Sequence, residues 1–175
     1  MEETVLVKKA KLGDKDALVQ LIMNQKNDYY RLAYVYLKNN EDALDAMEDM
    51  ILILYENIYT LKKNSAFYSW SKTILINCCK RILREQKRTV PLETVKELSY
   101  EGDFEEKNNE MLLEKYLSEL DERHQEVIKL RYLLDLDYKT IAVILKVPLG
   151  TIKSRIYYGI SRLQEKFGGD DLEQD

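Results

Sequence analysis

Apolar residues recur along most of the chain at intervals of three and four positions, the spacing of amphipathic helices. Asp14 is a good N-cap, and the pattern after it predicts one long helix that ends at Asn39–Asn40. A second helix is predicted from Asn40 or Glu41 to about Tyr59, and a third from about Ser65 to Arg88. Their expected inward faces are Leu18, Leu21, Ile22, Tyr29, Leu32, Ala33 and Tyr36; Ala43, Met47, Met50, Leu54 and Ile58; and Phe67, Trp70, Ile74, Cys78 and Ile82.

The periodicity fades between residues 89 and 109, where a proline, a glycine and seven acidic residues up to position 110 predict an acidic tether. A short ordered piece is expected within it at 92–98. Helical spacing resumes near Glu110 and ends near Phe167. The sequence therefore predicts an all-α protein with two small helical domains, 1–88 and 110–168. A flexible linker, 89–109, joins them, and a disordered tail, 169–175, follows.

Composition agrees with this organisation. A chain of 175 residues with 45% hydrophobic residues, six glycines and two prolines has enough apolar surface for two small helical cores. No apolar run approaches the roughly 18 residues that a membrane span needs, and the N-terminus lacks the apolar segment of a signal peptide. We therefore expect a cytoplasmic protein. The adjacent Cys78 and Cys79 and the lone His124 offer no zinc-binding spacing, and we expect no metal or cofactor.

The net charge of −4 alone argues against a nucleic-acid ligand, but the charge is segregated. Residues 60–88 carry eight bases and one acid, and residues 138–166 carry six bases and one acid. Residues 39–59 carry six acids and no base. On the third helix a polar and basic stripe lies opposite the predicted core. It is made of Thr73, Asn77, Lys80, Arg81, Arg84 and Arg88. This distribution favours two surfaces for a polyanion and one for a basic partner or for solvent.

Residues 135–163 have the pattern of a helix-turn-helix. Ile141, Ala142 and Leu145 mark the inner face of a first helix, and residues 146–148 make a tight turn. The second helix buries Ile152, Ile156, Ile160 and Leu163, which leaves a polar and basic outer face without an acid from Tyr138 to Gln164. A major groove accepts such a face, because Lys and Arg donate to guanine edges and phosphates.

Other functions fit less well. A stand-alone transcription regulator would use the same helix-turn-helix, but it would need a ligand pocket or a dimer seam in the first domain. A helical adaptor would leave both basic surfaces without a role. An enzyme is disfavoured, because the chain has one histidine, no glycine-rich phosphate loop and no metal spacing.

Two segments in a fixed order narrow the choice. EDALDAMEDMILILYENI followed by LKKNSAFYSWSKTILINCCKRILREQKR resembles region 2 of the extracytoplasmic-function class of bacterial sigma factors. The matching positions are Asp42, Ala43, Asp45, Asp49, Phe67, Trp70, Ile74, Asn77 and Arg84. The C-terminal segment resembles region 4 of the same family at Ile141, Ala142, Leu145, Val147, Pro148, Gly150, Thr151, Lys153, Ser154 and Arg155. The resemblance covers about residues 12–167.

The resemblance implies a protein that joins core RNA polymerase, recognises −10 and −35 promoter elements and enables transcription initiation of a stress or envelope-response regulon. The clamp coiled coil of the largest polymerase subunit would bind Asp42, Asp45, Glu48 and Asp49. The −10 element would contact Lys62, Lys63, Asn64, Ser65, Tyr68, Asn77, Lys80, Arg81 and Arg84. The −35 element would contact Thr151, Lys153, Ser154, Arg155, Tyr157, Tyr158 and Arg162. The C-terminal domain would also meet the polymerase flap. An anti-sigma factor would restrain the protein and could hold it at the membrane.

Three positions depart from the family pattern. Lys146 replaces the usual turn glycine, so we expect a non-glycine residue at positive φ. Glu48 replaces a glutamine. Tyr158 stands where a base is common, which predicts an unusual −35 preference.

Overall fold

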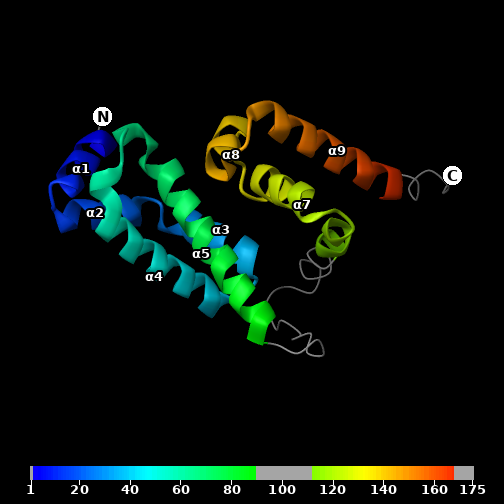
Figure 1. The fold of residues 1–175 in the computed structure, drawn as a ribbon, viewed down its shortest axis with the longest axis horizontal. Coiled ribbons are helices and arrows are strands. Elements are labelled where there is room, and N and C mark those ends of the chain that lie inside the picture. Colours follow the sequence, from blue (N-terminus) through cyan, green and yellow to red (C-terminus); the bar gives the residue numbers. More distant parts are fainter. Residues whose placement is uncertain (1, 90–111, 168–175) are drawn as a thin grey trace. The chain divides into compact units, whose positions relative to one another are not determined.

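The computed structural model describes residues 2–89 and 112–167. The chain divides into two compact units, Met1–Leu98 and Ser99–Asp175, and the described parts of both are helical (Figure 1). The predicted linker with its ordered piece at 92–98 and the predicted tail lie outside the described residues, apart from residue 89. The all-α class with two helical domains is confirmed.

Within residues 2–89 of the first unit there are five α-helices and two short 3₁₀ turns. They are α1 (Glu2–Lys11), α2 (Lys15–Asn24), α3 (Lys26–Leu37), α4 (Asn40–Asn57), η1 (Ile58–Thr60), η2 (Asn64–Ala66) and α5 (Phe67–Thr89). Helices α3, α4 and α5 pack against one another, while α1 packs on α2 and on both 3₁₀ turns. Helix α1 was not predicted from the sequence. Its buried side consists of Leu6, Val7 and Ala10.

The prediction of one long helix after Asp14 is wrong. Asp14 does cap a helix, accepting from the Ala17 backbone N–H at 3.0 Å, but α2 ends at Asn24 and α3 starts anew at Lys26. Gln25 between them has a φ of −123°, outside the helical range. The break allows α2 to pack on α1 while α3 packs on α4 and α5. One straight helix could not make both sets of contacts.

The buried face of α5 differs from the predicted one by part of a turn. Trp70, Ile74 and Ile82 are half-buried, and the fully buried row is Phe67, Ser71, Leu75, Ile76, Cys78 and Cys79. Ser71 is tolerated there because its hydroxyl donates to the Tyr68 carbonyl at 3.0 Å and its oxygen accepts from the buried Tyr29 hydroxyl at 2.7 Å. Burial also raises the pKa of the Cys79 thiol to about 12, so this cysteine is an inert core residue.

The second unit contains a helical segment at 112–118, α7 (Glu122–Ile128), a π-helical turn η3 (Lys129–Leu133), α8 (Tyr138–Leu145) and α9 (Leu149–Phe167). Asp121 and Asp137 cap α7 and α8, each accepting two backbone N–H groups. Lys146 has a φ of 56°, so the expected left-handed residue in the turn is confirmed. The buried residues of α8 are Ile141 and Ile144; the predicted Ala142 and Leu145 are half-buried.

Gly159 explains how closely α7 and α9 pack. This residue is buried in the middle of α9, and a Cβ built on it would lie 2.7 Å from Ile128 Cδ1 and 3.4 Å from His124 Cβ. Glycine lowers helix stability by up to about 1 kcal/mol relative to alanine. In return, the glycine lets α7 and α9 approach without displacing the Ile128 side chain.

Gly159→Leu is expected to lower the free energy of unfolding by about 1–3 kcal/mol, because the added side chain overpacks the contact with α7. Gly150→Leu is the matched control in the same helix, since nothing lies within 4 Å of a Cβ at Gly150. Urea denaturation followed by circular dichroism measures both. Equal stability of the two variants would contradict the close packing of α7 and α9.

Candidate nucleic-acid interface and partner surface

The four acidic residues predicted to bind a partner lie on two different sides of α4. Asp45 and Glu48 are exposed on the outward side. Asp42 and Asp49 lie on the flank beside α5, where Asp42 accepts from Gln86 Nε2 at 2.8 Å and Asp49 forms an ion pair with Arg81. Asp45 and Glu48 are therefore better placed than Asp42 and Asp49 to receive another molecule.

The same outward side of α4 carries exposed apolar residues that the sequence analysis missed. Leu44, Leu52 and Tyr55 are each at least half exposed, with Leu52 at 61%. At 100° per residue they share one face with Asp45 and Glu48. A signal was available, because α4 has more apolar residues than one buried stripe requires. We call Leu44, Asp45, Glu48, Leu52 and Tyr55 the α4 outer face; Tyr59, 67% exposed, follows it in η1.

The predicted −10 loop lies between η1 and η2. Lys62, Lys63 and Ser65 are exposed, whereas Asn64 is half-buried. The ammonium of Lys11, on α1, donates to the Leu61 carbonyl at 2.6 Å and to Asn64 Oδ1 at 3.4 Å. The sequence analysis did not single out Lys11, and no local pattern could have done so, because 50 residues separate it from Leu61.

Tyr68 is half-buried beside this loop, with its ring edge-on to Phe67 at 5.4 Å between centroids. Burial, with Glu3 next in effect, raises the pKa of its hydroxyl, and a hydrogen bond with Asn24 opposes the shift. Part of the ring is accessible, but the side chain is held by its own domain.

The predicted basic stripe of α5 forms an exposed edge that includes Asn77, Lys80, Arg81 and Arg84. Arg81 is partly neutralised by Asp49, and the Arg84 Nε donates to the Lys80 carbonyl at 3.3 Å. The structure thus brings a predicted partner-binding acid and a predicted DNA-binding base together as one ion pair.

On α9 the predicted −35 residues form a continuous outer surface through the first half of the helix. Lys153 and Ser154 are exposed, while Thr151 and Arg155 are half-buried. Tyr157 and Tyr158 are 68% and 63% exposed and pack edge-to-face at 5.5 Å. Two bases and two aromatic rings therefore project from the helix that follows the turn.

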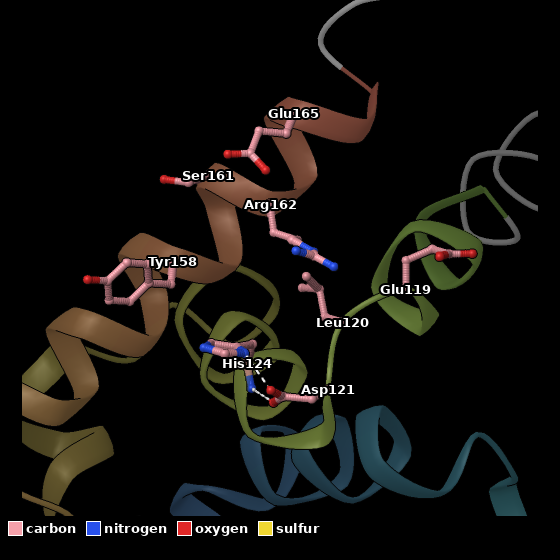
Figure 2. A pocket seen from close by; sticks show the side chains of 8 residues that line it. All are labelled: Glu119, Leu120, Asp121, His124, Tyr158, Ser161, Arg162 and Glu165. Carbon is pink, nitrogen blue, oxygen red and sulfur yellow. Dashed lines mark hydrogen bonds and ion pairs between the residues drawn. The ribbon is translucent and has the colours of Figure 1, made fainter.

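Arg162 lies one turn beyond Tyr158 on α9. It lines a pocket between α7 and α9 together with Glu119, Leu120, Asp121, His124, Tyr158, Ser161 and Glu165. Figure 2 shows its guanidinium extending toward Leu120, while the Tyr158 ring points away from that segment. Two of the lining residues contact each other: His124 Nδ1 lies 3.0 Å from Asp121 Oδ2. The backbone N–H of His124 is the main cause that lowers the pKa of the Asp121 carboxyl.

Residues 2–89 and 112–167 contain no group of three or more His, Cys, Asp or Glu side chains arranged to hold a metal ion. Among the same residues no helix is long and apolar enough to cross a membrane.

The helix-turn-helix of the second unit and the exposed bases of α5 and α9 are features of a DNA-binding transcription protein. Comparison with family models identifies the family: residues 21–89 match Sigma-70 region 2 and residues 116–165 match Sigma-70, region 4. The chain belongs to the sigma-70 family of RNA polymerase sigma factors and to its extracytoplasmic-function class, and it is a promoter-specificity sigma factor.

Curated relatives match the chain over nearly its whole length. The chain is 32% identical over 166 residues to RNA polymerase sigma factor SigV of Bacillus subtilis, covering 94% of this chain and 99% of SigV. It is 30% identical over 181 residues to the ECF RNA polymerase sigma-E factor of Haemophilus influenzae, covering 95% of each. The fold resembles that of the sigma factor RpoE solved with the anti-sigma factor NepR from Bartonella quintana. That match has a TM-score of 0.64 and 23% identity, and it covers 86% of this chain and 96% of that one.

Proposed function

We propose that three surfaces divide the work of this sigma factor: the α4 outer face binds the polymerase clamp, the −10 loop with α5 binds the −10 element, and α9 binds the −35 element. The observation that carries the proposal is the separation of charge. The outward side of α4 is acidic and apolar, whereas the exposed edge of α5 and the outer surface of α9 are basic. A basic, partly apolar partner fits the first surface and a polyanion fits the other two.

At the −10 element, one unpaired base enters the loop at Lys62, Lys63, Asn64 and Ser65, beside Tyr68. Extruding a base costs a few kcal/mol, which polar contacts and phosphate binding offset. Asn77, Lys80 and Arg84 hold the strand along α5. Arg81 contributes less charge than its neighbours, because Asp49 already pairs with it.

At the −35 element, α9 lies in the major groove, with Lys153 and Arg155 donating to base edges or phosphates and Thr151 and Ser154 beside them. Tyr157 and Tyr158 offer apolar surface for thymine methyl groups and hydroxyls for hydrogen bonds. Arg162, one turn beyond Tyr158 on α9, donates to the phosphate backbone.

The C-terminal domain also meets the polymerase flap, and an anti-sigma factor covers one or more of these surfaces until a stress or envelope signal releases the protein. The RpoE–NepR complex supports this partner class. The protein acts in the bacterial cytoplasm with the polymerase, contributes no catalytic step of its own, and is held at the membrane only through that partner.

In vitro transcription tests the proposal. Core polymerase with the purified protein and a library of linear promoters is expected to initiate at new start sites, and the protein without core polymerase is expected to leave duplex promoter unbound. Sequence-specific duplex binding in the absence of core polymerase, with no new start sites, would instead identify a stand-alone helix-turn-helix regulator.

Tyr158→Arg is expected to change the preferred −35 sequence toward a guanine at one position, because arginine donates to guanine O6 and N7. Selection of promoters from a library randomised in the −35 element measures the change. Ser161→Arg, one turn further along α9, is the control for added charge. An unchanged −35 preference in the Tyr158→Arg protein would rule out a base contact by Tyr158.

A further inference from the structure

The structure assigns a role in promoter specificity to Lys11, which lies before the matched region 2. We propose that Lys11 is a positioning residue that holds the −10 loop and orients the Asn64 amide toward the incoming base. This inference rests on the proposed −10 role of the loop and adds a residue from α1 to it.

The position of Lys11 is fixed by its backbone. It is the last residue of α1, and the chain turns at Gly13, which has a φ of 96°. The Gly13 N–H donates to the Ala10 carbonyl at 3.0 Å and the Asp14 N–H donates to the Lys9 carbonyl at 3.1 Å. These two bonds form a Schellman motif, which closes the helix end and stabilises the residue that carries the ammonium.

One ammonium holds both ends of the loop. Its bond to the Leu61 carbonyl fixes the residue where the chain leaves η1, and its bond to Asn64 Oδ1 fixes the residue where η2 begins. Only Lys62 and Lys63 lie between these two anchors, and both are exposed. Because α1 packs on η1 and η2, Lys11 links the loop to a part of the domain outside α4 and α5.

The bond also sets the polarity of Asn64. A lysine ammonium has only donors, so it binds the amide oxygen of Asn64 and turns the Nδ2 donor group away from itself. Without Lys11 the amide could rotate and present either its oxygen or its nitrogen. With Lys11 in place, Asn64 offers a hydrogen-bond donor, which favours a base with an acceptor at the contacted position over one with a donor there.

The experiment uses the full chain with core polymerase and promoters that differ by single bases in the −10 element. Lys11→Met removes the ammonium and keeps an unbranched side chain that is one atom shorter, and Lys8→Met is the control at an exposed position of the same helix. Because the hydrogen bonds that are lost come from a charged donor, we expect Lys11→Met to lower discrimination at one −10 position by roughly tenfold. Affinity for core polymerase and the −35 preference should stay within twofold of wild type, as should every readout of Lys8→Met.

Two further variants separate this inference from the proposed function. Asn64→Ala removes the reader itself, and Asn64→Asp keeps an acceptor for Lys11 but has no amide donor, so both are expected to lose the same discrimination. Adding Lys11→Met to Asn64→Ala should cause no further loss, because Lys11 acts through Asn64.

If Asn64→Ala retains the wild-type −10 preference, the proposed role of the loop fails. If Asn64→Ala loses that preference and Lys11→Met keeps it, the inference about Lys11 alone is overturned. Weakened binding of Lys11→Met to core polymerase would also overturn it, because that result would show a structural effect on the whole domain.

Discussion

Replacing both Asp45 and Glu48 with lysine is expected to weaken binding to core RNA polymerase by at least about 100-fold. These two carboxylates lie on the α4 outer face beside Leu44, Leu52 and Tyr55, so reversing their charge places like charges against a basic partner in a partly desolvated contact. Such juxtaposition costs several kcal/mol. Titration of fluorescently labelled protein with core polymerase measures the change in Kd, and the loss should be smaller at high salt, where repulsion is screened.

The matched control is Asp16→Lys with Asp28→Lys, which changes the net charge equally at exposed positions of α2 and α3. It should bind core polymerase within about threefold of wild type, since surface charges distant from an interface mainly affect long-range attraction. Equal weakening by both double variants would show that net charge decides the affinity and that the α4 outer face is not the docking surface.

Replacing Lys153 and Arg155 with alanine is expected to reduce initiation from promoters with a −35 element by about 30-fold or more. Each good contact to a base edge contributes about 1–3 kcal/mol of discrimination, and both side chains lie on the outer surface of the first half of α9. Neither residue is fully buried, so the helix itself should keep its stability. Runoff transcription over a range of promoter concentrations gives the effect.

A promoter whose −35 element is replaced by unrelated sequence provides the internal control. On that template the double variant should lose much less activity relative to the wild type than on the intact promoter, because base-edge contacts are absent and only contacts to phosphates remain. An equal loss on both promoters would show that neither side chain reads the −35 sequence, and the proposed base contacts of Lys153 and Arg155 would then be wrong.

The helical class, the starts of α4 and α5 and the helix-turn-helix follow from local features. N-caps, apolar spacing and the tight turn act within a few residues of chain, so they can be found without tertiary structure. The left-handed Lys146 was predicted from the family resemblance, because the family pattern has a glycine at that turn. By contrast, the break at Gln25 carries no proline or glycine, and it becomes necessary only because α2 and α3 pack against different neighbours.

The errors in the core and in the partner surface share one cause. On α5, Trp70 and Ile74 were favoured over Ser71 because serine is polar, and only the hydroxyl of Tyr29 makes Ser71 a suitable core residue. On α4, the four acids were treated as one group, although Gln86 and Arg81 engage Asp42 and Asp49. Both results depend on residues more than 30 positions away in the chain.

The sequence by itself determined the helices, their order, the separation of acidic from basic segments and, through the two matched regions, the sigma-factor family. Only the tertiary structure decided which side of each helix remains available to a partner. It separated Asp45 and Glu48 from Asp42 and Asp49, added Leu52 and Tyr55 to their surface, and brought Lys11 to the −10 loop. The physical reason is that periodicity describes one helix at a time, whereas burial, ion pairing and loop anchoring depend on contacts between helices distant in sequence.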